Sequence, residues 1–584
     1  METVRALVVT EDAPGVNTGG FGEWKGQANT AARHSLTAYS FHLGEYIRVL
    51  KTTTWVGFKL EVVRAMRDSQ DNVGSLSVAD FKIDRHADVY GFRFDQPHTV
   101  NGASRTLSDY DMILFFPQVS SEPDPDDATN KAEAAAIATF MESGRGFFAT
   151  GDHYNLGSKL AGIIPRVRNM RRWWANSASF PKAPSGFDGS RNDTTVAGND
   201  STVVFEDQSD EVPQQIEPTM YGAGLTVRQG YPATVSVPHP LLCSPLGIVD
   251  VLPDHMHEGW CEVPSDLTQM VSTGTTSVRE YPDYNGAPLA PEVVALGTVT
   301  AGKTTRVVDF ADSGGDGTPF PPTNAKQFGV IAAWDGQRVG KGRVAVDSTW
   351  HHFFNINLTG DRFFENLSNL PPGDEQKKHG FFVDDVAVPA YEKIQAYYRN
   401  IIYWLIPANR TNGIFWASMF ELVRNAQLRE EMTLRDFTEY KFGHYPYFAQ
   451  LAESYFKSVQ GACSVYKIRR ILYKPKIPWY EWIEEIVDPW DPALARRGPS
   501  EELAREQFLG VVGLAPSTDA MLKLGMGAAM ITAATLRHEK KLDTATIEKH
   551  FDQVFDHAVG LYAKNLRAGH AVTARIEALV NAKR

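Results

Sequence analysis

The chain has 584 residues, of which 43% are hydrophobic, 22% charged and 11% aromatic, and its formal net charge is −12 at pH 7. This composition is typical of a globular protein and excludes a disordered or fibrous chain. The length exceeds the roughly 250–300 residues that one hydrophobic core supports, so we expect at least two domains. The net negative charge lies in residues 1–412, and such a surface repels nucleic acid and anionic membranes.

The first part of the chain predicts strands and helices in alternation. Short apolar runs, typical of strands covered on both faces, occur at Val4–Thr10, Phe58–Val63, Tyr110–Phe116 and Gly146–Thr150. Helical spacing of apolar residues occurs between them, at Ser35–Leu50 and Asn130–Glu142. This order predicts an α/β fold with a mostly parallel sheet and helices on both of its faces.

A polar segment follows at about residues 175–230. It is rich in Ser, Asp, Asn, Gly and Pro, which predicts a long loop insertion of the kind that often forms a functional flap. Further strands are predicted at Ala233–Val237, Val293–Thr298, Thr305–Phe310, Val330–Trp334 and Gly342–Asp347, and a helix at Tyr391–Leu405.

Helical patterns dominate the rest of the chain. They occur at Ile414–Leu428, Tyr447–Val459, Glu501–Val512, Thr518–His538 and Thr544–Ala582. We therefore predict an α/β domain at residues 1–412 and an all-helical domain at residues 413–584. The most apolar late segment, Leu522–Leu536, contains Lys523 and is too short to cross a bilayer of about 30 Å, so we expect no membrane partner.

Three cysteines, Cys243, Cys261 and Cys463, are too few and too scattered to predict a disulfide framework or a zinc site. The N-terminal residues lack the basic start and long apolar run of a signal peptide. Both observations favour a cytoplasmic protein.

Polar clusters follow predicted strands or lie in loops near them. They are Glu11-Asp12, Asp152-His153, His257-Glu258 and His351-His352. Because the carboxyl ends of parallel strands meet at one edge of a sheet, we expect these groups to converge there and form a site.

The spacing of these clusters resembles the class I glutamine-amidotransferase-like superfamily, and most closely its trehalose-utilisation (ThuA-like) branch, over about residues 1–405. The nucleophile turn of the amidotransferases reads G-x-C-x-G, and the similar turn here is Gly151–Asn155. The ThuA-like G-x-H turn matches Gly151-Asp152-His153. Other matches are His239-Pro240 with His257–Trp260, and Gly340–Val344 leading to His351-His352.

The resemblance implies a flavodoxin-like sheet and leaves the helical domain without a counterpart. It also implies that the protein is not a glutaminase. His153 stands where the nucleophilic cysteine would be, and neither Cys243 nor Cys261 lies at a strand-to-helix turn. Glutamine hydrolysis needs an activated thiolate.

Histidine and carboxylate chemistry is what these residues can supply. Imidazole passes protons near neutral pH, with a carboxylate fixing its tautomer. We predict a catalytic set of His153, Asp152, His257, Glu258, His351 and His352, with His153 as the central acid or base. The predicted substrate-binding residues are Glu11, Asp12, Tyr154, Asn155, Arg172 and Trp260.

A divalent metal is the alternative use of the same residues, with His153, His257 and His352 as candidate ligands. We place proton transfer first, because the His255–Glu258 run lies in a predicted loop and no HExxH helix pattern occurs. The sequence leaves any other cofactor unknown.

Two basic stretches admit two interpretations each. Arg166–Arg172 could clamp an anion, but we favour pairing with the acidic loop Glu206–Glu211. Lys467–Lys476 could grip single-stranded nucleic acid. A solvated face or a partner-binding surface is favoured instead, because acidic residues at 481–488 cancel its charge, and we expect no nucleic-acid partner.

The sequence therefore favours an enzyme that binds a small polar, sugar-like molecule and catalyses isomerisation, elimination or hydrolysis by acid–base chemistry. One alternative is a non-catalytic binding or assembly protein whose residues 413–584 mediate homo-oligomer or protein-partner contacts. The other alternative is a metal-dependent hydrolase.

Overall fold

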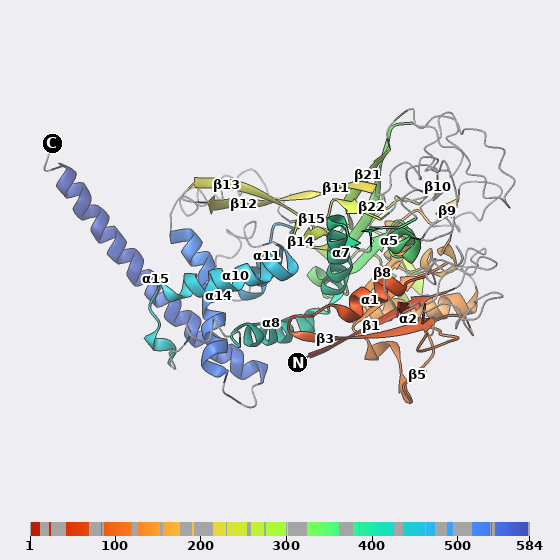
Figure 1. Ribbon diagram of the computed structural model, residues 1–584, viewed down its shortest axis with the longest axis horizontal. Coiled ribbons are helices and arrows are strands. Elements are labelled where there is room, and N and C mark those ends of the chain that lie inside the picture. The colour runs from red at the N-terminus through yellow and green to blue at the C-terminus, as the bar shows by residue number, and fades with distance from the viewer. Residues whose placement is uncertain are drawn as a thin grey trace.

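The computed structural model places a sheet-containing body beside a group of helices, from which α15 extends to the C-terminus (Figure 1). It describes residues 2–11, 23–24, 42–68, 83–84, 87–118, 127–151, 156–175, 190–191, 214–228, 231–253, 259–273, 276–299, 301, 324–360, 378–384, 386–424, 432, 436–461, 463–473, 488–493, 517–537, 539 and 543–581.

Nine of the described strands form one sheet. Five parallel strands lie at its centre in the spatial order β3 (Phe58–Met66), β1 (Glu2–Thr10), β7 (Met112–Phe116), β8 (Gly146–Thr150) and β23 (Val344–Asp347). Antiparallel strands extend it through β22 (Lys326–Trp334), β21 (Glu292–Val299), β11 (Gln214–Pro218) and β16 (Val251–Leu252). If the five parallel strands are numbered by their order in the sequence, their spatial order across the sheet is second, first, third, fourth and fifth.

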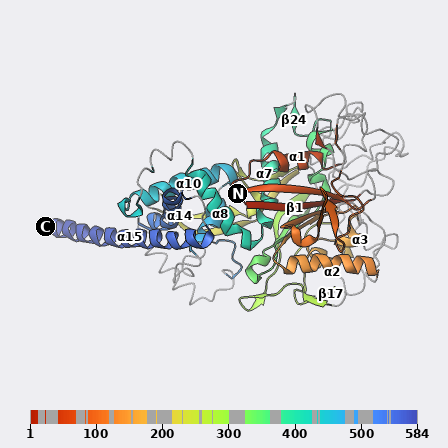
Figure 2. The same ribbon diagram turned by 90° about the horizontal axis from the view of Figure 1, so that it is seen from below.

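The apolar runs produce this sheet because both of its faces are covered. β7 and β8 are buried along their whole length, and alternate side chains enter two separate cores. One core lies under α1 (Gly44–Thr52), α5 (Asn355–Thr359) and α7 (Pro389–Leu405), and the other under α2 (Ala128–Glu142), α3 (Ser158–Ala161) and α4 (Val167–Met170). Figure 2 shows α1 and α7 on one side of the sheet and α2 and α3 on the other. The predicted α/β sheet with helices on both faces is confirmed.

Part of the segment predicted to be a loop forms strands. β11 and β12 (Met220–Arg228) lie in it, and β12 pairs with β13 (Tyr231–Pro238). The prediction was wrong there because one of the two buried side chains of β11, Gln214, is polar and only Ile216 is apolar, so that the composition hides the period of the strand. The strand predicted at Thr305–Phe310 and the helix predicted at Glu501–Val512 lie outside the described residues.

Helices make up most of the later chain: α8 (Ala408–Leu422), α10 (His444–Gln460), α11 (Cys463–Tyr473), α14 (Ser517–Leu536) and α15 (Thr544–Asn581). α14 contacts α8, α10, α11 and α15 around a core of its own. The domain boundary predicted at residues 412–413 falls within α8, where Ile414 belongs to the first core and Phe415 to the helical core. None of the described helices has the length and apolar character that crossing a membrane requires.

Short elements complete the described part. Paired strands are β2 (Glu23–Trp24) with β4 (Ile83–Asp84), β5 (His98–Val100) with β6 (Ala103–Arg105), β9 (Trp174–Ala175) with β10 (Ser190–Arg191), β14 (Cys243–Ser244) with β15 (Gly247–Ile248), β17 (Met270–Thr273) with β18 (Thr276–Arg279), β19 (Asp283–Tyr284) with β20 (Ala287–Pro288), and β24 (Phe382–Val383) with β25 (Val386–Ala387). The 3-10 helices are η4 (Leu107–Asp109), η5 (Pro240–Leu242), η6 (Gly336–Val339), η7 (Trp350–His352) and η9 (Phe437–Glu439).

A disulfide joins Cys243 of β14 to Cys463 at the start of α11. The sequence, which indicated no disulfide framework, did not predict this single pairing. The two residues are 220 positions apart in sequence, and only the packing of α11 beside β14 brings them together. Because two of the three cysteines are paired, the cysteine content no longer favours a reducing compartment such as the cytoplasm. Cys261 is free and buried.

Candidate functional site

The carboxyl edge of the parallel strands is where the sequence predicts a site, and Arg171 lies at its centre. The Arg171 guanidinium is fully buried, and its Nε donates to the carbonyl oxygen of Ser348, 2.9 Å away, just after β23. A Cβ added at Gly151, just after β8, would lie 2.8 Å from Arg171 Cζ, and one added at Gly259 would lie 2.7 Å from the same atom. The backbones of three segments thus meet around one guanidinium.

These three segments flank most of the predicted catalytic residues. Asp152, His153, Tyr154 and Asn155 follow Gly151 directly, and His257 and Glu258 precede Gly259 directly. These six residues and Asp12 lie outside the described residues. The Trp350 N–H donates to the Gly151 carbonyl at 2.9 Å, so η7, which carries His351 and His352, is joined directly to the turn that leads to His153.

His352 is held by a buried carboxylate. Its Nδ1 lies 2.7 Å from Asp347 Oδ1, and the Tyr397 hydroxyl donates to Asp347 Oδ2 at 2.6 Å. Burial and the Asp347 charge hold the pKa of Tyr397 well above its usual value, so the phenol keeps its proton. Because a carboxylate accepts the Nδ1 proton, the lone pair of a neutral His352 ring is on Nε2, as a general base requires.

His351 has a different environment. Its Nδ1 lies 2.8 Å from Asn357 Oδ1, and its ring stacks on Trp350 with centroids 4.7 Å apart. The side chains of His351 and Trp350 are both buried. His351 and His352 are neighbours in sequence, but their Nδ1 atoms have different polar partners, and only His352 is paired with a carboxylate through that atom.

Glu11 lies after β1, beside the end of β7. Its carboxylate pairs with Arg67 at 3.0 Å and accepts a hydrogen bond from the Gln118 backbone N–H at 3.1 Å. Arg67 also pairs with the fully buried Glu133, at 2.8 Å. The predicted substrate-binding carboxylate of Glu11 is therefore engaged by groups of the protein itself.

The structure brings Arg172 and Trp260 together. The Arg172 guanidinium lies 4.7 Å from the centroid of the Trp260 ring and pairs with Glu262 at 2.8 Å. Lys326 Nζ lies 4.5 Å from the same ring. A cation over an indole face is a favourable contact, which fixes Trp260 next to the strand-end segments.

The other arginines of this stretch have glutamate partners at unexpected positions. Arg168 pairs with Glu280 at 2.8 Å, with both groups buried, and Arg166 pairs with Glu142. The acidic loop Glu206–Glu211, which we expected to be the partner, lies outside the described residues.

Among the residues that the structure describes, there is no cluster of three or more His, Cys, Asp or Glu side chains that could hold a metal ion. The proposed ligands His153 and His257 fall outside the described residues, so the metal alternative stays a prediction.

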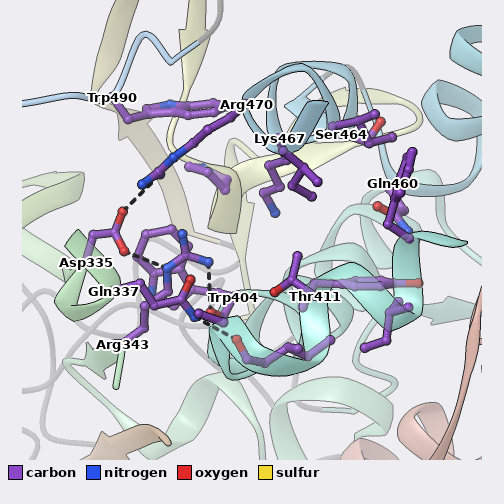
Figure 3. Close-up of a pocket in the computed structure, with 18 of the residues that line it drawn as sticks. Asp335, Gln337, Arg343, Trp404, Thr411, Gln460, Ser464, Lys467, Arg470 and Trp490 are labelled. Carbon is purple, nitrogen blue, oxygen red and sulfur yellow. Dashed lines mark hydrogen bonds and ion pairs between the residues drawn. The ribbon is translucent and has the colours of Figure 1, made fainter. Parts of the chain in front are cut away.

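A cavity of about 520 Å³ lies at the opposite, amino edge of the parallel strands, and Figure 3 shows the side chains that line it. Its lining comes from β21, η5, η6, α7, α8, α10 and α11, together with Arg343 just before β23 and Trp490. The sequence did not indicate this cavity, because these elements are distant in the chain. One signal was present: Ser464, Lys467, Ile468 and Ile471 follow helical spacing and place one lysine on a face with apolar residues.

The basic residues of α11 are not on a solvated face, so that interpretation was wrong for the described ones. Arg469 pairs with Glu453 at 2.8 Å, and Arg470 pairs with Asp488 at 3.2 Å. Lys467 lines the cavity. Asp488 is one of the acidic residues at 481–488 that were expected to balance this stretch, whereas the pairing of Arg469 with Glu453 of α10 was not expected from the sequence.

Comparison with protein families, curated proteins and solved structures found no match to this chain.

Proposed function

We propose that the protein is an enzyme that binds a small polar, sugar-like molecule at the carboxyl edge of its parallel sheet and transfers protons by histidine and carboxylate chemistry. The observation that carries this proposal is the position of Arg171, in contact with Gly151, Gly259 and Ser348. This position favours convergence of the segments that carry His153, His257 and His352. Each of these histidines is only a few positions in the sequence from one of the three residues around the Arg171 guanidinium.

The roles follow from the chemistry of each group. His153, beside Asp152, is the central acid or base at the strand-to-helix turn. His352, held through Nδ1 by Asp347, supplies a second imidazole whose Nε2 exchanges the proton. Two imidazoles on different segments can remove a proton from one atom and return it to another, which is what isomerisation and elimination require.

The strand order supports the amidotransferase-like interpretation of the fold. The order second, first, third, fourth, fifth is that of flavodoxin-like sheets, whose ligands bind where the strand order reverses. Here the reversal lies between β1 and β7, next to Glu11. We propose membership of the ThuA-like branch on this order together with the motifs.

The cysteines support the exclusion of glutaminase activity. Cys243 is in a disulfide. Cys261 is buried, and burial raises the pKa of its thiol well above the usual range, with the nearby Asp347 charge acting in the same direction. A thiol held in this form is a poor nucleophile.

Proton transfer can be tested without knowing the substrate. Aldoses, ketoses and 2-hydroxy acids are incubated with the protein in D2O, and proton NMR follows the loss of C–H signals next to the carbonyl or carboxyl carbon. We expect exchange or turnover with at least one compound, its loss in His153→Ala and in His352→Gln, and its retention in His570→Ala, which alters an exposed histidine of α15. Equal rates in wild type and His153→Ala would exclude the mechanism.

Assembly through α15 is a second candidate function. Val572, Ile576 and Leu579 follow helical spacing near its end, and they are 55–60% exposed. Such a stripe is typical of a helix that packs against a partner. Sedimentation velocity tests it: Ile576→Lys should reduce the mass of any oligomer, and Ala574→Lys, an exposed change on the opposite face, should not. A monomeric wild type would exclude self-assembly through this stripe.

A further inference from the structure

The cavity at the amino edge has charged side chains gathered at one end, and apolar side chains form part of the rest of its lining. Asp335, Arg343 and Arg470 lie at the charged end (Figure 3), which Trp490 borders. The apolar part is formed by Ile414, Phe415, Phe456 and Ile468. A volume of about 520 Å³ is within the range of small-molecule sites in proteins, which combine apolar walls with a few polar groups.

The guanidinium groups at the charged end are already neutralised. Asp335 pairs with Arg343 at 2.7 Å and with Arg338 at 3.2 Å. Arg338 and Arg470 both pair with the fully buried Asp488. Burial acts to raise the pKa of Asp335, but the charges of Arg343, Arg338 and Arg470 outweigh it and hold that pKa well below its usual value. The arginines therefore have internal counterions.

Lys467 differs from these arginines. Figure 3 shows its nitrogen directed into the cavity. In the part of the chain that the structure describes, Lys467 Nζ forms neither a hydrogen bond nor an ion pair. Burial, together with the positive charge of Arg343, lowers the pKa of Lys467 to about 7, against a smaller opposing effect of Asp335. Glu292 also lines the cavity, and its carboxylate accepts a hydrogen bond from the Tyr221 hydroxyl. The cavity thus contains an amine that has no counterion among the residues that the structure describes.

His239 adds a neutral polar group to the lining. Its Nδ1 accepts a hydrogen bond from the Leu241 N–H at 3.3 Å. Burial, and the charge of Lys467, hold the pKa of its imidazole well below the usual value. A neutral ring whose Nδ1 accepts carries its proton on Nε2, so His239 is a hydrogen-bond donor there.

We propose that this cavity binds a small amphipathic carboxylate, whose head pairs with Lys467 and whose apolar body lies against Phe415 and Phe456. A head with a single charge fits better than a phosphate, because the arginine forks that would bind phosphate in bidentate fashion are paired with aspartates. This site lies at the opposite edge of the sheet from the proposed catalytic residues, and the inference does not depend on the proposed function.

Binding should be accompanied by proton uptake. A carboxylate next to an amine favours the charged ammonium form and raises its pKa. At pH 8, where a lysine with a pKa of about 7 is mostly neutral, the complex takes up close to one proton per bound carboxylate. Isothermal titration calorimetry in buffers with different ionisation enthalpies measures this number.

Octanoate is the probe. Octanol and octylammonium serve as comparison ligands, because they have the same chain length with a neutral head and a cationic head, respectively. We expect octanoate to bind best and to change tryptophan fluorescence, since Trp404 and Trp490 line the cavity. Lys467→Met, which keeps an unbranched apolar chain and removes the amine, should weaken octanoate binding by tenfold or more and abolish the proton uptake. Lys457→Met, at an exposed position on α10, is the matched control and should bind as wild type.

A chemical measurement on the wild-type protein covers the case in which Lys467→Met does not fold. Reductive methylation at pH 7 should modify Lys467 faster than exposed lysines, because more of its amine is neutral, and octanoate should protect it. Octanol binding as tightly as octanoate, unchanged octanoate binding in Lys467→Met, or methylation of Lys467 that octanoate does not slow would each overturn the proposal.

Discussion

A methyl group added at Gly151 tests the packing around Arg171. The alanine Cβ would lie 2.7 Å from Trp173 Cζ3 and 2.8 Å from Arg171 Cζ, and both of these side chains are fully buried. Overpacking of this kind costs about 1–3 kcal/mol, so Gly151→Ala should lower the free energy of unfolding by that amount. Gly259→Ala meets the same guanidinium, and its φ of +82° adds about 1–2 kcal/mol of backbone strain.

The double variant measures whether the two glycines share Arg171. Because both methyl groups displace one guanidinium, the effects should be non-additive by at least about 0.5 kcal/mol. Urea unfolding followed by tryptophan fluorescence gives the four free energies. Gly443→Ala is the control, since its φ is −60° and the added Cβ meets open space, and it should change stability by less than about 1 kcal/mol. Additive effects, or a Gly151→Ala protein as stable as wild type, would refute the convergence around Arg171.

Three further predictions concern stability. Cys463→Ser should lower the free energy of unfolding by up to about 5 kcal/mol, because the disulfide closes a loop of some 220 residues; a variant with wild-type urea resistance would contradict this. Asp488→Ala leaves the buried Arg338 without one of its carboxylates and should cost about 3–5 kcal/mol, against about 0–1 kcal/mol for Asp283→Ala in an exposed pair; equal losses would argue against a buried network. The folded protein releases the Lys467 proton near pH 7, below the ordinary value of 10.5, so wild-type stability should rise relative to Lys467→Met between these pH values; parallel pH profiles of the two proteins would refute the lowered pKa.

The central strands could be predicted from sequence because burial on both faces leaves long apolar runs. Val4–Thr10 and Gly146–Thr150 are examples, and they correspond to β1 and β8. The antiparallel direction of β22 could not be predicted, since an apolar run of this kind does not encode strand direction. The positions of Asp152-His153 and His351-His352 shortly after the ends of β8 and β23 follow from the same pattern.

Contacts between distant segments could not be predicted. The disulfide, the Arg338–Asp488 pair and the cavity each join elements of the sheet-containing body to the later chain. Charged residues such as Arg469 are usually solvated, so a single sequence favours that interpretation, although Arg469 is buried and paired with Glu453. Only the partner, placed by the fold, shows that the charge is buried.

Crosslinking can show whether His153 and His257 lie at one site in solution. Cysteines replace both histidines in a Cys261→Ala background, and dibromobimane, which becomes fluorescent when it bridges two nearby thiols, is added. We expect rapid bridging in this pair and none in a control pair of His153→Cys with His570→Cys. A first pair that bridges no faster than the control would contradict the gathering of the histidines at the carboxyl edge of the sheet.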